Sequence, residues 1–202
     1  MIEQGTPEWH KMRLGKVTAS RVPDIVARSS KNAFLKSRDN YKMELALERL
    51  TGNWDEGVKK SVAMQRGIDL EPFARNHYSF LKNVDVKECA FVDHPKIKMS
   101  GASPDGMMEK SGVEIKCPNS QTHFETLIKN KITNSRYITQ IQWQQACCGW
   151  DWTDFVSFDD RFPLKHQMVI IRVERDDDAI KLLEEQVEEF LTEVDTVLEN
   201  LK

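Results

Sequence analysis

The most constraining feature of this sequence is a short alternating segment in the middle of a chain that elsewhere shows helical spacing. In residues 112–118, the apolar Val113 and Ile115 alternate with the charged Glu114 and Lys116. Because successive side chains of a strand point to opposite faces, this pattern predicts a strand with one apolar and one charged face. The proline that follows ends it, so the strand cannot continue into the next segment.

Helical spacing dominates on both sides of this strand. Apolar residues recur three and four positions apart, and Thr6-Pro7 and Thr18 are typical of helix starts. Pro72 lies inside one long helical segment and predicts a kink there or two shorter helices. The remaining helices are expected at 38–50, 58–81, 120–129, 135–148 and 176–202, and further strands at 84–93, 97–99, 153–158 and 166–173.

This order of elements predicts an α/β fold with a central mixed β-sheet flanked by helices. The chain has 202 residues, which suits one core of ordinary size. No linker or repeat divides the sequence, so we expect a single domain over residues 1–202.

Composition excludes several classes of protein. No apolar run reaches membrane-spanning length, and no basic region precedes an apolar one near Met1, so the cytoplasm is the expected location. The four cysteines form no CxxC pair and no Cys/His ladder, which favours buried thiols in a reducing compartment over a zinc or iron–sulfur site. The five histidines form no HExxH-like pair, and none is assigned to metal. The net charge is −3, but much of the acid lies in 176–202, so a basic surface elsewhere remains compatible with nucleic acid.

Chemistry-bearing residues gather around the alternating strand. Glu114 and Lys116 are two apart and share one face, while Asp105 arrives from the turn-rich segment 101–106 just before. Two carboxylates that converge repel each other and favour a divalent cation, and oxygen-only ligation suits Mg²⁺ or Mn²⁺. A lysine beside the metal can hold or deprotonate a water and neutralise a phosphate oxygen. The pattern indicates metal-assisted phosphodiester hydrolysis.

Taken alone, Glu114 and Lys116 also fit a solvated ion pair on an exposed strand. Two features favour the catalytic interpretation. One is the Pro104-Asp105 turn just before the strand, and the other is the amide-rich helical segment 137–145, whose glutamines can line a polar cleft.

With these motifs the chain resembles the PD-(D/E)xK nuclease superfamily and, more narrowly, phage lambda exonuclease and its viral recombinase-type relatives. Four segments carry the likeness in the family's order, and together they span most of the chain. They are 8–15 with 18–20, then 66–71, then 103–106 with 114–118, and last 137–142. The resemblance implies a restriction-endonuclease-like core.

The resemblance also implies roles for the central residues. Asp105, Glu114 and the backbone carbonyl of Ile115 would bind the metal, and Lys116 would position or activate the attacking water. Glu71 matches a helix carboxylate near a second metal, although a capping or surface acid before a proline is an equally good interpretation.

An active-site glutamine belongs to the same pattern. Gln142 matches it and is expected to touch the water or the scissile phosphate. Gln140 is the alternative, two positions earlier on the same helix.

A second site is implied near the N-terminus. Arg13 and Ser20, with Thr18 assisting, match a pocket for a 5′-terminal phosphate. A guanidinium forks onto phosphate oxygens, and a hydroxyl with backbone N–H groups completes such a cradle. Without the resemblance, Arg13 would be taken as a helix-surface cation.

Related enzymes suggest the expected activity and partners. These are Mg²⁺-dependent, processive 5′–3′ digestion of linear double-stranded DNA with 5′-phosphorylated ends, release of mononucleotides and a 3′ single-stranded product. The resemblance further implies a homotrimeric ring and a single-strand annealing protein as partner. It also implies a phage or prophage protein in a bacterial cell. Basic side chains are candidates for the DNA channel; they are Arg28, Lys31, Lys36, Arg38, Lys42, Lys59, Lys60 and Arg66.

Two other functions remain open from the sequence. The first is an endonuclease or repair nuclease of the same superfamily, without the end pocket and the ring. The second is a DNA-end-binding module with a decayed centre, against which the intact Asp105, Glu114 and Lys116 speak.

Overall fold

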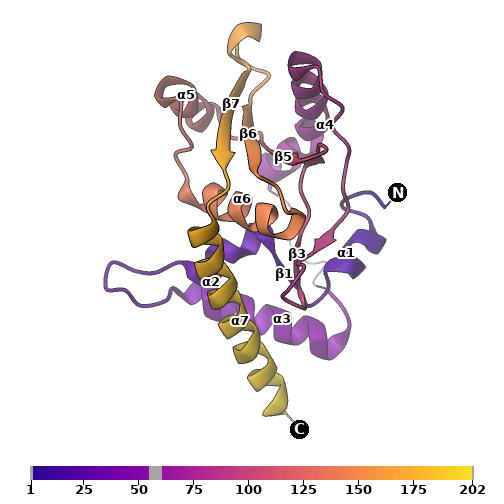
Figure 1. Ribbon diagram of the computed structural model, residues 1–202, viewed down its shortest axis with the longest axis vertical. Helices are drawn as coiled ribbons and strands as arrows, with labels where there is room; N and C mark the ends of the chain where they lie inside the picture. The colour runs from indigo at the N-terminus through magenta and orange to yellow at the C-terminus, as the bar shows by residue number, and fades with distance from the viewer. Residues whose placement is uncertain (1, 55–60, 202) are drawn as a thin grey trace.

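The computed structural model describes residues 2–54 and 61–201 and has an α/β architecture, in which helices surround two mixed β-sheets (Figure 1). One sheet has the strand order β1-β3-β2, and its members are β1 (Val17–Thr18), β2 (Val92–Asp93) and β3 (Ser100–Ala102). The other has the order β4-β5-β6-β7, and its members are β4 (Gly106–Met107), β5 (Ser111–Lys116), β6 (Trp152–Phe158) and β7 (Met168–Glu174). The expected α/β fold with mixed strands flanked by helices is confirmed, although its strands form two sheets.

The second sheet positions the alternating strand at its centre. β5 runs parallel to β6, with Glu114 opposite Phe155, and antiparallel to the short β4, with Gly106 opposite Val113. β6 and β7 form an antiparallel pair over seven residues. As a result, the residue just before β4 lies beside the middle of β5.

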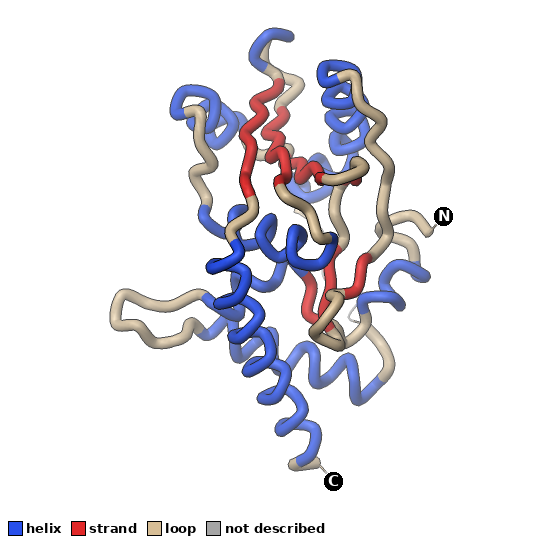
Figure 2. The backbone as a smooth tube through the Cα atoms, viewed as in Figure 1, coloured by secondary structure: helices blue, strands red, loops and turns tan. Residues whose placement is uncertain are grey.

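Helices cover these sheets at several levels of the molecule (Figure 2). The long α4 lies beside β5 at one end, and α6 crosses the middle of the molecule below the strands (Figure 1). Their bounds are α1 (Pro7–Arg13), α2 (Val22–Val26), α3 (Lys36–Thr51), α4 (Val62–Lys82), α5 (Ser120–Lys129), α6 (Ser135–Cys148) and α7 (Asp177–Glu199), with 3-10 turns η1 (Ala19–Arg21) and η2 (Leu164–His166).

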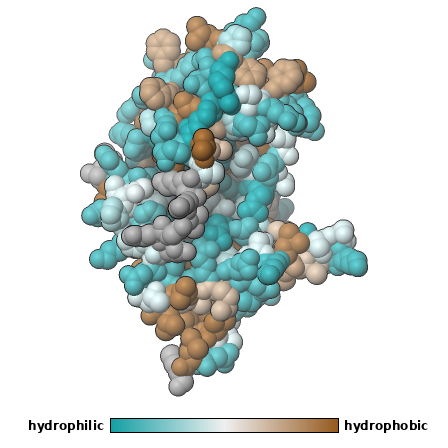
Figure 3. Space-filling model, turned by 180° about the vertical axis from the view of Figure 1, so that it is seen from behind, coloured by the Kyte–Doolittle hydropathy of each residue, from teal (hydrophilic) through white to brown (hydrophobic). Residues whose placement is uncertain are grey.

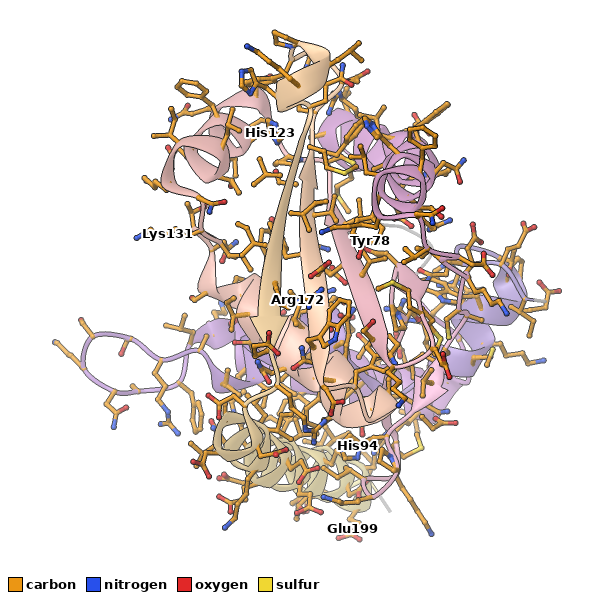
Figure 4. All side chains as sticks on the ribbon, turned by 45° about the horizontal axis from the view of Figure 1, so that its top comes forward. Tyr78, His94, His123, Lys131, Arg172 and Glu199 are labelled. Carbon is orange, nitrogen blue, oxygen red and sulfur yellow. The ribbon has the colours of Figure 1, made fainter. Side chains whose placement is uncertain are left out.

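The core follows this arrangement. The largest apolar cluster joins α2, α3, α6 and α7 around Trp143, Tyr41 and Phe190, with Phe190 stacked on Tyr41. A second cluster packs Tyr78 of α4 against the apolar face of β5 and β6, which includes Val113. Tyr78 also donates a 2.9 Å hydrogen bond to the buried Asp154 on β6 (Figure 4). The second cluster therefore packs β5 against α4, while α6 contributes to the first.

Between α2 and α3 the chain projects as a loop (Figures 1 and 2). A bridge between Arg28 and Phe34 closes it, and the Arg28 guanidinium lies 3.8 Å above the Phe34 ring. Arg28, Lys31 and Lys36 are all exposed there. Three of the predicted basic DNA-contacting residues thus lie on or beside one projecting segment.

Most expected elements are present, with four differences. Residues 97–99, expected to form a strand, form a bend and a turn, and the strand begins at Ser100. The helix containing Pro72 is one helix over its whole length, not two shorter ones. The strand expected at 84–93 is reduced to Val92–Asp93 and an isolated bridge between Lys87 and Met107, because most side chains from 84 to 88 are exposed. The turn expected at 101–106 contains the end of β3 and the first residue of β4. At Gly101 the Phe91 ring and the Val92 carbonyl oxygen lie 2.4 Å from where a Cβ would be, so only glycine permits this strand pairing.

Among the described residues, no helix combines the length and apolar character needed to cross a membrane.

Candidate active site

Asp105 and β5 are joined directly by a hydrogen bond. The Ile115 backbone N–H donates to Asp105 Oδ2 at 2.7 Å. The antiparallel pairing of β4 with β5 makes this contact possible, because it returns the chain alongside the strand immediately after Asp105. The predicted approach of the turn carboxylate to the strand is therefore what the structure shows.

Glu114 is the most enclosed charged group of the cluster, with a side chain that is 0% exposed. Its Oε1 accepts hydrogen bonds from Lys116 Nζ and, at 2.7 Å, from Gln140 Nε2. Its Oε2 accepts a 2.6 Å hydrogen bond from Gln144 Nε2. The charged face of β5 is thus not solvated but covered by α6, which excludes the simple surface ion pair.

Gln142 does not join this cluster. Its Nε2 donates to the Glu174 carbonyl at 2.8 Å, and its Oε1 accepts from the Asp176 N–H at 3.0 Å. Residues four apart share a helix face, whereas a residue two positions on points about 200° away from the first. The assignment of Gln142 to the site is corrected to Gln140, the alternative, and Gln144 joins it on the same face.

The carboxylates and the lysine influence each other's protonation. Burial and the nearby Glu114 raise the pKa of Asp105 well above its usual range. Burial alone would lower the pKa of Lys116, but Glu114 and Asp105 raise it overall. Lys116 therefore remains an ammonium at neutral pH, while Asp105 holds a proton more readily than an ordinary carboxyl group.

Glu71 on α4 lies within electrostatic reach of the same cluster. Burial raises its pKa, with Glu114 adding to the effect, while Arg75 and Lys116 oppose it. Arg75 Nη2 donates to Glu71 Oε1 at 2.6 Å, and Arg75 Nε donates to the Asp105 carbonyl at 2.7 Å. Glu71 is thus a paired, partly buried acid facing the site and not a cap or a free surface residue.

The donor set fits a hard divalent cation. Asp105 and Glu114 offer carboxylate oxygens, and their mutual repulsion would be relieved by a positive ion. Within the described ranges, no group of three or more His, Cys, Asp or Glu side chains is gathered into a preformed metal site. In this arrangement the Lys116 ammonium occupies the cation's place beside Glu114. Two carboxylates supplemented by a backbone carbonyl remain compatible with the oxygen ligation that Mg²⁺ and Mn²⁺ prefer.

The residues predicted to bind an end phosphate line one pocket of about 200 Å³. Arg13, Thr18 and Ser20 share it with an aromatic wall that includes Trp9 and Trp54. The Arg13 guanidinium lies 3.9 Å from the Trp9 ring centroid, and burial lowers the pKa of Arg13 to about 10. Arg13 is thus charged at neutral pH and held in place by stacking.

The two arginines that line this pocket differ in their ion pairs. Arg21 is paired with Asp24 at 2.7 Å and with Glu44 at 2.8 Å. Across residues 2–54 and 61–201, no carboxylate comes within ion-pair distance of Arg13. Of these two arginines, Arg13 is therefore the one available to an added anion.

Several of the predicted DNA-contacting basic residues have structural partners. Arg38 is 2% exposed and bonds Glu193 and the Ile25 carbonyl, so its assignment to a DNA surface is wrong. Lys42 also pairs with Glu193, and Arg66 pairs with Asp159 and Asp160. Lys59 and Lys60 lie outside the described residues.

Two site residues escaped the sequence reasoning. Arg75 and Gln144 both lie on helix faces whose contacts depend on a strand far away in the chain. Each lies four residues after a predicted site residue on the same helix, Gln144 after Gln140 and Arg75 after Glu71. This spacing, which puts both residues of a pair on one helix face, was the feature of the sequence that could have identified them.

Known proteins similar to this chain share its fold. An alkaline exonuclease from Laribacter hongkongensis, LHK-Exo, has a solved structure that is 45% identical, with a TM-score of 0.88 over 97% of this chain and 96% of that one. The structure of LHK-Exo in complex with dAMP matches with a TM-score of 0.89 and the same identity over 98% and 96% of the two chains. A phage-related exonuclease from Haemophilus somnus 129PT shares the fold at 17% identity, with a TM-score of 0.74 over 93% and 96%. No curated protein matches the sequence significantly.

The fold and the carboxylate–lysine cluster define an exonuclease-like α/β protein. Residues 8–151 match the YqaJ-like viral recombinase domain, and the chain belongs to that family. The predicted kinship with viral recombinase-type exonucleases is confirmed.

Proposed function

We propose that this protein is a divalent-metal-dependent deoxyribonuclease that digests linear double-stranded DNA from 5′-phosphorylated ends. The observation that carries the proposal is the cluster of Asp105, Glu114 and Lys116 beside the C-terminal half of β5. Such a cluster combines metal-binding oxygens with a cation that neutralises phosphate charge. We take residues 1–202 as one nuclease domain.

Each residue has a proposed task. Asp105, Glu114 and the Ile115 carbonyl hold a metal, Mg²⁺ or Mn²⁺, which would supply Lewis-acid chemistry when bound. Lys116 would orient the attacking water, and Gln140, which donates to Glu114, would contact the same water or the scissile phosphate. Glu71 stands where a second metal would bind, beside Glu114 and Lys116.

The end pocket gives the proposed enzyme its direction. Arg13, Thr18 and Ser20 would receive the 5′-terminal phosphate, and the lack of an ion-pair partner for Arg13 among the described residues supports this assignment. Digestion would then proceed 5′ to 3′, release mononucleotides and leave a 3′ single strand for a single-strand annealing protein.

Exposed Arg28, Lys31 and Lys36 around the projecting loop support contact with DNA phosphates. A homotrimeric ring around the duplex would make digestion processive despite the net charge of −3.

A linear duplex with one 5′-phosphorylated and one 5′-hydroxyl end tests the proposal. With Mg²⁺, we expect mononucleotides from the phosphorylated strand alone, and with EDTA we expect none. Cleavage without end preference, or of closed circles, would favour an endonuclease of the same superfamily. No cleavage with any divalent metal would favour a DNA-end-binding module.

A further inference from the structure

The two carboxylate oxygens of Glu114 have different surroundings. Oε1 faces Lys116, whose side chain is 26% exposed, and the half-buried Gln140. Among the described residues, Oε2 accepts its hydrogen bond from Gln144, which is 0% exposed. One oxygen thus lies toward the open side of the site, and the other is enclosed by α6.

The orientation of the Gln144 amide is fixed by chemistry. An ionised carboxylate accepts hydrogen bonds and donates none, so the Gln144 nitrogen must face Glu114. This leaves Gln144 Oε1 buried and without a hydrogen-bond partner among the described residues. A buried acceptor without a partner destabilises the folded state. The fold tolerates this cost at a position where the amide gives Glu114 Oε2 a donor.

We propose that Gln144 is a positioning residue that confines Glu114 to ligation through Oε1 alone, and so favours Mg²⁺ and Mn²⁺ over Ca²⁺. The reason lies in the geometry that each ion accepts. Ca²⁺ takes six to eight oxygens and commonly uses both oxygens of one carboxylate, whereas Mg²⁺ demands a compact octahedron. Glu114 Oε2 is enclosed by α6 and fixed by a buried amide, so it lies away from the open side of the site, where a metal would reach Oε1. The inference rests on the proposed metal site.

Gln145 provides a matched control on the same helix. It is also 0% exposed and also has an unpartnered Oε1, but its Nε2 donates to Thr153 Oγ1 at 3.2 Å and to the Val173 carbonyl at 2.9 Å. Replacing either glutamine by methionine removes a buried amide of the same size. Only the change at position 144 frees Glu114.

Calorimetric titration of the metal-free protein with Mn²⁺ and with Ca²⁺, without DNA, tests the inference. Wild-type protein should bind Mn²⁺ more tightly than Ca²⁺. In Gln144→Met the ratio of the two dissociation constants, Ca²⁺ over Mn²⁺, should fall about tenfold, and in Gln145→Met it should stay as in the wild type. Circular dichroism establishes that each variant is folded.

The outcomes separate the two proposals. Selective wild-type binding with an unchanged ratio in folded Gln144→Met would overturn the role of Gln144 and leave the metal site standing. Equal affinity of the wild type for both ions would overturn that role without any variant. No binding of either ion to the wild type would overturn the metal centre and the inference with it.

Discussion

Lys116 enters the site as a cation. Its ammonium donates to Glu114, and the neighbouring carboxylates outweigh burial in setting its pKa, so it does not lose its proton spontaneously near neutral pH. A metal placed between Asp105 and Glu114 would repel this ammonium and turn it toward the water and the phosphate. The main contribution of Lys116 is therefore its positive charge and its orientation of the water, and not the removal of a proton.

Lys116→Ala should lower cleavage of linear duplex DNA by at least about a hundredfold, because the charge beside the reacting phosphate is lost. DNA binding, followed by fluorescence anisotropy, should survive. Lys96→Ala, which changes a lysine 73% exposed and remote from β5, serves as the control. Retained turnover in Lys116→Ala would refute the proposed role.

The raised pKa of Asp105 makes the stability of the metal-free protein depend on pH. An acid whose pKa is raised by folding stabilises the folded state at low pH, and this contribution is lost as pH rises through the folded-state pKa. Asp105→Asn removes the ionisable group and still lets Ile115 N–H find an acceptor.

Metal-free Asp105→Asn should therefore unfold at a higher temperature than the wild type at pH 8, by roughly 2–4 °C, and the difference should vanish toward pH 4. Thermal melts across this range measure it. Asp85→Asn, at a carboxylate that is 82% exposed, should show no such trend. A pH-independent difference would mean that Asp105 is not electrostatically strained.

Arg13 is the residue on which end recognition depends. Arg13→Ala should reduce the preference for 5′-phosphorylated over 5′-hydroxyl ends by about ten- to a hundredfold, since a charge-assisted bond to phosphate contributes ~1.5–3 kcal/mol. Competition between the two substrates in one reaction measures the preference. Arg136→Ala, which changes an arginine paired with Asp24 on the surface, should leave it unchanged. An undiminished preference in Arg13→Ala would show that the phosphate binds elsewhere.

At the scale of elements, α6 has two polar faces with separate tasks. Gln140 and Gln144 hold the Glu114 carboxylate, whereas Gln142 and Gln145 hold the backbone of β7 and its exit into α7. The helix itself is anchored by Trp143, which stacks on His94 at 4.8 Å. A single rigid helix thus fixes the site and closes the fold.

This division predicts opposite effects for two neighbouring glutamines. Gln142→Ala should lower the free energy of unfolding by about 1–3 kcal/mol, because the Asp176 N–H and the Glu174 carbonyl lose partners, with cleavage intact well below the melting temperature. Gln140→Ala should lower cleavage with little change in stability. Urea unfolding and initial rates of digestion separate the two. The reverse pattern would restore Gln142 to the site.

At the scale of the whole molecule, several apolar side chains are more than half exposed. Met43, Leu47 and Leu50 on α3 are 56%, 58% and 61% exposed, and Leu201 after α7 is 65% exposed. Figure 3 shows apolar side chains gathered at the lower end of the molecule, where Figure 1 has α3 and the end of α7. Exposed apolar surface of this kind favours contact between copies of a chain.

The proposed ring therefore predicts a particle with the mass of three chains. Light scattering coupled to size exclusion, at the concentration used for digestion, measures that mass. The same preparation should digest long linear DNA without releasing partly digested intermediates and should spare closed circles. A single-chain mass with full activity would remove the ring from the mechanism.

The sequence by itself determined the local elements. α5 and α6 have the bounds expected from the sequence, and β5 follows from strict alternation. These features depend on neighbours along the chain, which a sequence displays directly. The same local logic placed Asp105, Glu114 and Lys116 in one cluster, because ten or so residues of hairpin cannot separate them far.

Only the tertiary structure decided which side chains meet across the chain. The choice between Gln140 and Gln142 depended on how α6 is rotated over β5, and that rotation is set by the burial of Trp143 and Ile141 against distant elements. From the sequence alone, Arg38 is expected to be a surface cation. In the structure it is buried, because α7 places Glu193 against it. The division of the strands into two sheets, and the loss of most of the strand expected at 84–93, have the same cause, since pairing and packing join residues that the sequence holds far apart.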